Sequence, residues 1–141
     1  MDLLPLPAHL FAAATALWEE AGLTRPWNDP DADLLRAMSG PASTVLGACD
    51  EQGRLLGTAM VGHDGHRGWV YYLAVRPEER RNGLGRQLMR ACEAWVRQRG
   101  VPKIQLMVRG ANSDVMAFYS SLGYEQSDVV VLARFLTDSE P

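Results

Sequence analysis

Residues 69–90 have the sequence WVYYLAVRPEERRNGLGRQLMR, which predicts a strand, a turn and the start of a helix. Residues 69–75 are apolar, aromatic or β-branched, as expected of a buried strand. Pro77 ends the pairing because it has no N–H to donate to a neighbouring strand. The apolar spacing that begins at Gly83 predicts a helix that continues to Arg99.

The turn before this helix carries the motif Arg-x-x-Gly-x-Gly, formed by Arg80, Gly83 and Gly85. Two glycines let the backbone approach a ligand that a Cβ would exclude. The helix N-terminus adds unpaired N–H groups and a partial positive charge. The segment therefore predicts a site for a phosphate or pyrophosphate group.

Two common phosphate-binding motifs do not fit this segment. A P-loop requires Lys-Ser/Thr directly after the second glycine, where Arg86-Gln87 stand. A Rossmann fingerprint requires a third glycine at position 88, which is Leu88, and an acidic residue about 20 positions further on.

A second motif lies downstream, with an intervening strand expected at residues 103–108. Its members, in order, are Asn112, Ala117, Phe118, Tyr119, Leu122, Gly123 and Tyr124. The two motifs together resemble the GNAT superfamily of acetyl-CoA-dependent N-acyltransferases, over residues 44–135. Residues 25–30 and 63–68 also resemble its small stand-alone bacterial branch of the YpeA type.

Length and composition indicate a single domain over residues 1–141. The hydrophobic content of 47% is ordinary for a globular chain. No apolar run reaches membrane-spanning length, and Asp2 with no basic segment disfavours a secretory signal. The two cysteines, Cys49 and Cys92, are expected to be reduced packing residues, and no Cys/His cluster has metal-ligand spacing. We expect a cytoplasmic, metal-free protein.

Charge is unevenly distributed along the chain. Residues 1–64 contain nine acidic and three basic residues, whereas residues 65–109 contain ten basic and three acidic residues. The basic block coincides with the predicted phosphate site, and its acidic flanks disfavour a nucleic-acid surface.

Periodicity and turn residues predict the remaining elements. Helices are expected at residues 8–21, from an Asp29 cap, at 83–99 and at 112–122, and strands at 2–6, 44–49, 55–63, 69–75, 103–108 and 129–136. The order indicates a mixed α/β (α+β) fold with helices on both faces of one sheet. The resemblance implies a mixed, mostly antiparallel twisted sheet of six to seven strands.

The resemblance also implies ligand contacts. Acetyl-CoA would bind at Arg80, Arg81, Asn82, Gly83, Leu84, Gly85 and Arg86, at the backbone of Leu73, Ala74 and Val75, and at Asn112 and Tyr119. Tyr119 would be the acid that protonates the leaving thiolate, because a phenol stays protonated at neutral pH. For Asn112 the alternative is a helix N-cap, and the two roles can coexist.

The base that removes the amine proton is not evident. Some superfamily members carry a glutamate on the central strand, but Trp69 occupies that position here. Tyr71, which alternation places on one face with Trp69 and Leu73, could hold a proton-accepting water. His63 and His66 are alternatives, although both fit a turn.

These observations indicate an N-acetyltransferase that acts by direct attack of a primary amine, small or peptidic, in a ternary complex. A non-catalytic acyl-CoA sensor and a phosphate-binding protein are the alternatives. The acidic N-terminal half and Trp27 predict a cationic acceptor near Trp27, Asn28, Asp29 and Tyr71. The oligomeric state is left open, a homodimer included.

Overall fold

The computed structural model describes residues 3–110 and 112–137, and the chain divides into two compact units, Met1–Leu106 and Met107–Pro141. The first unit holds β1 (Leu3–Pro5), the 3-10 helix η1 (Ala8–Leu10), α1 (Phe11–Glu20), α2 (Pro30–Met38), β2 (Ser43–Cys49), β3 (Leu55–His63), β4 (Gly68–Val75), the 3-10 helix η2 (Pro77–Glu79), α3 (Leu84–Gln98) and β5 (Ile104–Leu106). The second unit holds α4 (Ser113–Ser121).

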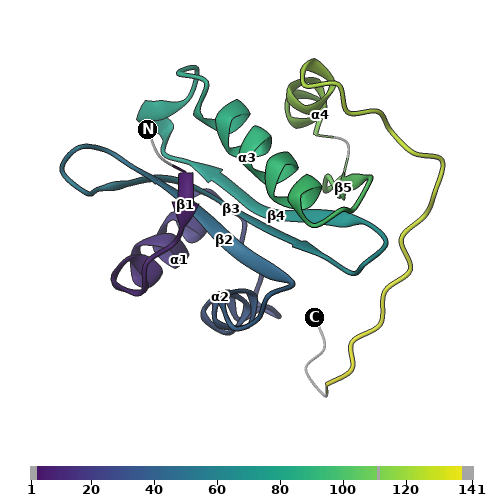
Figure 1. The fold of residues 1–141 in the computed structure, drawn as a ribbon, viewed down its shortest axis with the longest axis horizontal. Helices are drawn as coiled ribbons and strands as arrows, with labels where there is room; N and C mark the ends of the chain where they lie inside the picture. The colour runs from purple at the N-terminus through teal and green to yellow at the C-terminus, as the bar shows by residue number, and fades with distance from the viewer. Residues whose placement is uncertain (1–2, 111, 138–141) are drawn as a thin grey trace. The chain divides into compact units, whose positions relative to one another are not determined.

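The strands form one sheet in the order β1-β2-β3-β4-β5, antiparallel except for the parallel pair β4 and β5. Figure 1 shows α1 and α2 on one face of this sheet and α3 on the other. The predicted α+β fold with a mixed, mostly antiparallel sheet is confirmed. The described residues contain five strands, however, so the prediction of six to seven is wrong.

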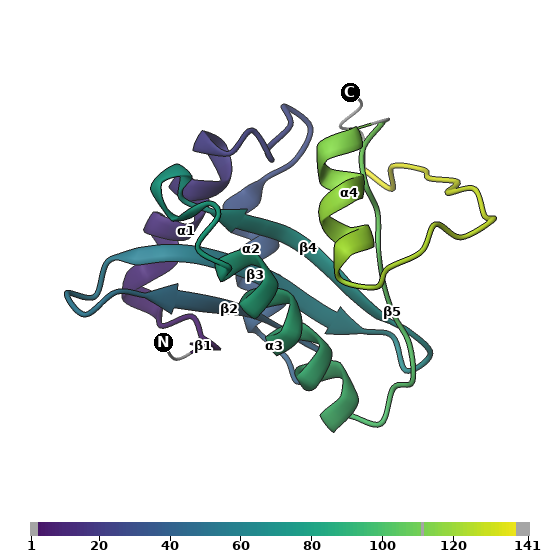
Figure 2. The same cartoon turned by 90° about the horizontal axis from the view of Figure 1, so that it is seen from above.

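Each face of the sheet has its own apolar layer. On the face of α1 and α2, Leu17, Trp18 and Leu34 pack with Val45 and Ala74 in one buried cluster. On the other face, α3 lies across β2, β3 and β4 (Figure 2). Its buried stripe is the one that the sequence predicts: Leu84, Leu88, Met89, Cys92, Trp95 and Val96.

Two glycines of the sheet let α3 lie close to it. A Cβ on Gly68 would stand 2.6 Å from a methyl of Val96, near the C-terminal end of the helix. A Cβ on Gly57 would stand 3.1 Å from methyls of Leu84 and Leu88, near its N-terminal end. The separation at Gly68 is well below van der Waals contact, so a side chain there would displace Val96, whereas at Gly57 the neighbouring atoms would have to shift by only a few tenths of an ångström.

The second unit contains the predicted helix but lacks the predicted last strand. Asn112 caps α4, its Oδ1 accepting the N–H of Val115 at 3.2 Å, and Gly123 has φ 94° after the helix. No strand occurs at residues 129–136, so that prediction is wrong. Apolar β-branched residues favour a strand only where a partner strand completes the ladder, and the described part of this unit contains no other strand.

The first strand and the fifth differ slightly from expectation. The strand expected at residues 2–6 is β1, an edge strand, with Asp2 outside the described residues. The strand expected at 103–108 is shorter, because β5 ends at Leu106.

Candidate active site

The segment between β4 and α3 forms a tight turn around the start of the helix. Gly83 is the N-cap residue of α3, with φ 80° and ψ 8°, and no side chain caps the helix there. Arg81 also has a positive φ, 75°. The first main-chain bond of the helix runs from the N–H of Gln87 to the carbonyl of Gly83, 3.0 Å. The N–H groups of residues 84–86 precede that bond and lack helical partners.

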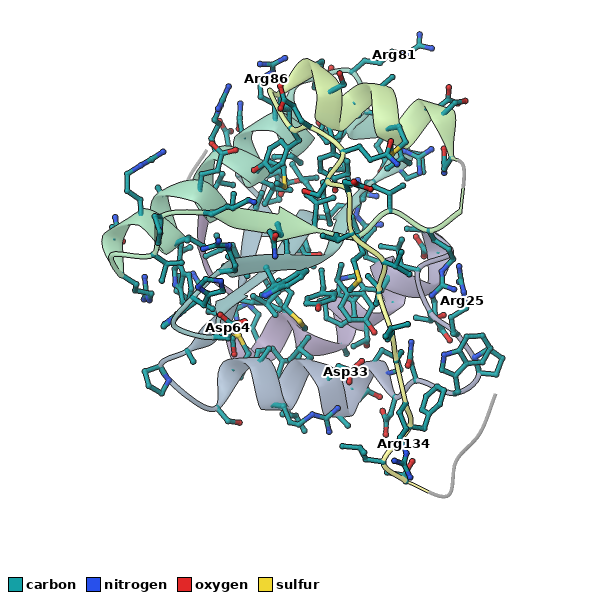
Figure 3. All side chains as sticks on the ribbon, turned by 90° about the vertical axis from the view of Figure 1, so that its right-hand side faces the viewer. Arg25, Asp33, Asp64, Arg81, Arg86 and Arg134 are labelled. Atoms are coloured by element: carbon teal, nitrogen blue, oxygen red, sulfur yellow. The ribbon has the colours of Figure 1, made fainter. Side chains whose placement is uncertain are left out.

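The charges around this turn suit an anion. Arg80, Arg81 and Arg86 are exposed, and none of them forms a salt bridge with the described residues. The Arg81 side chain extends away from the ribbon in Figure 3. Asn82 instead donates to Glu79 through its side chain, 3.0 Å, which holds the turn. Free N–H groups, a helix dipole and exposed guanidinium groups fit a phosphate or pyrophosphate group.

The C-terminal half of β4 has one open edge within the first unit. β5 pairs with Gly68, Trp69 and Val70 only, so residues 71–75 have no partner strand on that side. The N–H of Arg76 donates to Leu56 of β3 at 2.9 Å. Alternation then points the N–H and C=O of Val75 toward the open edge. This edge is at the end of β4 that leads into the turn at residues 80–83.

A β-bulge interrupts β4 beside that edge. Thr58 pairs with Ala74 and Met60 with Tyr71, so Tyr72 and Leu73 together oppose a single residue of β3. The bulge breaks the alternation: Tyr71, Tyr72 and Ala74 all face α1 and α2. Leu73 is therefore on the other face, and the expected shared face of Tyr71 and Leu73 is wrong.

Tyr72 has φ 51°, which is unusual for a bulky residue. Its ring stacks on Trp18 at 3.9 Å between centroids, and its hydroxyl donates to Oδ2 of Asp33 at 2.8 Å. Trp18 in turn donates to Oγ1 of Thr58 at 2.8 Å, and Thr58 donates to the carbonyl of Tyr72 at 3.1 Å. Burial, then the Asp33 carboxylate, raises the pKa of Tyr72, which keeps its hydroxyl protonated. These contacts hold the bulge in its strained conformation.

Sequence reasoning missed Tyr72 and gave Asp33 no separate role. A bulge is not visible as a motif, and two adjacent aromatic residues also suit a strand buried on both faces. The available signal was the break in alternation between Val70 and Val75. The pairing places a carboxylate of α2 against the central strand, which has none of its own.

The predicted acceptor residues lie at the α1–α2 connection and on β4. Trp27 is half-buried, and Asn28 is exposed. Asp29 caps α2, its Oδ1 accepting the N–H of Ala32 at 3.1 Å. Tyr71 is 46% exposed on the face of α1 and α2, and burial raises the pKa of its hydroxyl.

The two histidines proposed as alternative bases belong to a turn. Nδ1 of His63 accepts the N–H of Gly65 at 3.0 Å, and His66 is exposed. This turn precedes Gly68, whereas the open edge and the glycine turn lie at the other end of β4, roughly 20 Å away at 3.3 Å per residue. Trp69 donates to Oδ2 of Asp64 in the same turn, 3.3 Å.

The remaining predicted residues belong to the second unit. Asn112 is exposed and serves as the cap described above. Tyr119 is half-buried in α4 and makes edge-to-face contacts with Phe118, 5.0 Å, and Tyr124, 5.8 Å.

The described residues show neither a metal-ligand cluster nor a membrane-spanning helix. Among the described residues, no group of three or more His, Cys, Asp or Glu side chains could hold a metal ion. No helix in the described part of the chain has the length and apolar character needed to cross a bilayer.

Comparison with known proteins identifies the class. Residues 11–124 match the acetyltransferase (GNAT) family, and the chain belongs to that family. It is an acyltransferase, and acetyl-CoA-dependent N-acetylation is the activity typical of the family.

Solved structures agree on the fold. The aminoglycoside acetyltransferase AAC(6')-Iy, bound to a CoA bisubstrate analogue, has a TM-score of 0.79 and 18% identity, covering 96% of this chain and 98% of its own. The aminoglycoside 6'-N-acetyltransferase AAC(6')-IG from Acinetobacter haemolyticus has a TM-score of 0.77 and 18% identity, covering 98% of this chain and 100% of its own. The ribosomal-protein-S18-alanine N-acetyltransferase from Escherichia coli has a TM-score of 0.73 and 21% identity, covering 89% of this chain and 78% of its own.

Proposed function

We propose that this enzyme transfers the acetyl group of acetyl-CoA to a cationic primary amine by direct attack in a ternary complex. The observation that carries the proposal is the open edge of β4, at the end of the strand that leads into the uncapped helix start at Gly83. An extended amide chain ending in a pyrophosphate can use both features together. We assign it to the small stand-alone YpeA-type branch on the residues quoted above.

The binding roles follow from the groups available. The N–H groups of residues 84–86 and the side chains of Arg80, Arg81 and Arg86 would hold the pyrophosphate. The backbone at Leu73, Ala74 and Val75 would pair with the amides of the pantetheine arm as an added strand. Asn112 would donate to the same arm. Bound in this way, acetyl-CoA supplies an activated thioester.

The acid is assigned to Tyr119. When the acyl carbon–sulfur bond breaks, the sulfur leaves as a thiolate and takes the phenolic proton of Tyr119. This role rests on the position of Tyr119 in the family motif.

The base is assigned to Asp33, whose Oδ2 accepts the hydroxyl of Tyr72 on the central strand. Its Oδ1 forms a salt bridge with the largely exposed Arg36, so Arg36 would have to release this oxygen when the amine binds. One proton of the bound ammonium group passes to the Asp33 carboxylate, and the nitrogen lone pair then attacks the thioester carbonyl carbon. After attack the nitrogen loses a second proton, through water, to the phenolate that Tyr119 becomes when the departing sulfur takes its proton. Tyr72 orients that carboxylate through its 2.8 Å hydrogen bond. Tyr71, on the same face, offers a second route through a bound water. Replacing Asp33 and Tyr71 separately distinguishes the two routes.

A cationic acceptor suits the charge of this region. Residues 1–64 carry nine acidic against three basic residues, and Asp31 is exposed beside Asp33 on α2. A negatively charged surface attracts positively charged ligands. The ring of the half-buried Trp27 adds a face for a cation–π contact. Two structural neighbours are named for aminoglycosides and one for a protein alanine, all amine acceptors.

The test measures acetyl-CoA turnover with a panel of amines at low and high salt. The release of free thiol is the readout. We expect polycationic amines to be favoured, with a KM that rises with salt. Trp27→Ala should raise the acceptor KM. A preference for neutral or anionic amines would overturn the acceptor assignment, and absence of acetyl-CoA binding would overturn the whole proposal.

A further inference from the structure

Thr58 is a fully buried polar residue on β3 that links α1 to the bulge of β4. The indole N–H of Trp18 donates to Oγ1 of Thr58 at 2.8 Å, and the Thr58 hydroxyl donates to the carbonyl of Tyr72 at 3.1 Å. On the basis of the function proposed above, we propose that Thr58 is a positioning residue for acetyl-CoA. By holding the Tyr72 carbonyl, its hydroxyl directs the N–H of Leu73 toward the pantetheine arm.

The chemistry of the three groups fixes the direction of both hydrogen bonds. An indole N–H can only donate, and a carbonyl oxygen can only accept. The single proton of the Thr58 hydroxyl therefore lies toward the Tyr72 carbonyl, while the hydroxyl oxygen accepts the proton of Trp18. Thr58 and Trp18 are both 0% exposed, and a β-branched side chain has few χ1 rotamers. The protein itself thus holds this orientation, without solvent.

The carbonyl that Thr58 holds belongs to the peptide between Tyr72 and Leu73. This peptide is trans, so its C=O and its N–H point in opposite directions. The C=O points toward β3, which carries Thr58, and the N–H of Leu73 therefore points away from β3. Within the first unit, β5 pairs only with residues 68–70 of β4. The N–H of Leu73 thus faces the open edge.

Alternation along β4 does not by itself set the direction of this N–H. The bulge puts Tyr72 and Leu73 together opposite a single residue of β3, which interrupts the regular pattern of inward and outward groups. Val75, beyond the bulge, presents its N–H and C=O to the open edge. With Leu73 held by Thr58, two residues two positions apart offer groups on one edge. An added chain with successive amides requires this spacing, and the pantetheine arm contains two amides.

The simpler role for Thr58 is to satisfy the buried indole N–H of Trp18. The two roles predict different effects on binding. A residue that only satisfies the core changes the stability of the fold. A residue that positions the open edge changes the affinity for the pantetheine arm but leaves the helix start at Gly83 free to bind a pyrophosphate. Adenosine diphosphate has a pyrophosphate and no pantetheine arm, so it separates the two parts of the site.

The first experiment measures the Kd of acetyl-CoA and of adenosine diphosphate by calorimetry. Thr58→Val keeps the branched shape but loses the hydroxyl, and we expect the Kd of acetyl-CoA to rise roughly tenfold with that of adenosine diphosphate unchanged. Thr58→Ser, which restores the hydroxyl, should return most of the affinity. The matched control is Val45→Ala, which removes two methyl groups from the buried cluster that contains Trp18 and should bind both ligands as wild type does.

Three results would overturn the proposal: an unchanged acetyl-CoA affinity in Thr58→Val, an equal loss of affinity for both ligands, or no recovery in Thr58→Ser. A wild-type chain that does not bind acetyl-CoA would overturn the proposed function and this role with it. A wild-type chain that binds acetyl-CoA with an affinity independent of position 58 would overturn the role of Thr58 alone.

A second pair of variants covers the case in which Thr58→Val does not fold. That variant leaves the buried Trp18 N–H without an acceptor, whereas replacing both partners by apolar groups leaves no unpaired indole. The double variant Trp18→Phe/Thr58→Val is therefore compared with Trp18→Phe, which keeps the Thr58 hydroxyl as a donor to Tyr72. We expect the double variant to bind acetyl-CoA roughly tenfold more weakly than Trp18→Phe. Equal affinities would overturn the proposal.

Discussion

The hydroxyl of Tyr72 donates to Oδ2 of Asp33 over 2.8 Å, and this bond joins the bulge of β4 to the first turn of α2. The stack of Tyr72 on Trp18 joins the same bulge to α1. A tyrosine with φ 51° is thus tied to both helices of one face. A strained backbone persists only where its surroundings determine it in this way.

Loss of the Tyr72 hydroxyl should destabilise the fold modestly. Tyr72→Phe keeps the stacked ring but removes the hydrogen bond, at a cost of about 1 kcal/mol in unfolding free energy. Tyr72→Leu also loses the aromatic stack and should cost about 1 kcal/mol more. Urea denaturation measures both. Tyr71→Phe is the control, since Tyr71 is 46% exposed and its hydroxyl forms no hydrogen bond with the described residues. Equal stability of Tyr72→Phe and wild type would show that the bond is not stabilising.

Replacing Asp33 tests the assignment of the base. Asp33→Asn retains an acceptor for the Tyr72 hydroxyl but loses the proton-accepting carboxylate. We expect kcat/KM for the amine to fall roughly 10²- to 10⁴-fold while acetyl-CoA affinity is unchanged. Asp31→Asn, in the same turn of α2, should leave kcat nearly unchanged, because Asp31 is assigned no proton transfer and any effect of its charge on the acceptor would appear in KM. If Tyr71→Phe lowers the rate and Asp33→Asn does not, the water-mediated route is the correct one.

The helix start at Gly83 should control cofactor affinity. Gly83→Val places a β-branched residue at φ 80°, which displaces the N–H groups of the first turn. Acetyl-CoA affinity by calorimetry should fall at least tenfold, about 1.4 kcal/mol. Gly100→Val is the matched control, because Gly100 has φ 76° at the other end of the same helix. An equal loss of affinity in both variants would indicate general destabilisation.

Tyr119→Phe should act on turnover with little effect on binding. We expect kcat to fall roughly 10- to 1000-fold with a nearly unchanged Kd for acetyl-CoA, as for a group that acts in the transition state. Steady-state kinetics on an accepted amine provides the measurement. Tyr124→Phe, which retains the ring that contacts Tyr119, is the control. Full turnover by Tyr119→Phe would make Tyr119 a packing residue.

Asp64 should make stability depend on acid pH. Its pKa is lowered to about 2, first by the N–H of Arg67, then by that of His66. A lowered folded-state pKa contributes stability that is present above the unfolded value of about 3.9 and is lost as pH falls through about 2. The stability difference between wild type and Asp64→Ala should therefore shrink between pH 5 and pH 2 in urea titrations. For the control variant Glu51→Ala, on the hairpin between β2 and β3, the stability difference from wild type should stay constant over this pH range.

Local patterns predicted most of the elements because their causes are local. The stripe of α3, the Asp29 and Asn112 caps and the hairpin at residues 50–53 each depend on residues a few positions apart. The turn at Gly83 was found for the same reason. The strand at residues 129–136 was wrongly predicted because a strand also requires a partner, which a local pattern does not specify.

The bulge illustrates a second limit. Whether Tyr71 and Leu73 share a face depends on one extra residue in the pairing with β3, which is a property of two strands. The approach of Asp33 to Tyr72 spans 39 positions and depends on that bulge. The roles of Asn112 and Tyr119 toward acetyl-CoA remain predictions.

Gly68 and Gly57, beneath the two ends of α3, set how closely that helix lies on the sheet. Val96 rests over Gly68 and Leu84 over Gly57, about 18 Å apart along the axis at 1.5 Å per residue. A methyl group at Gly68 would stand 2.6 Å from Val96, about 1 Å inside normal contact. Val96, and with it the C-terminal end of the helix, would have to move away from the sheet. The phosphate contacts proposed for residues 84–86 therefore depend on Gly68, at the opposite end of the same helix, having no side chain.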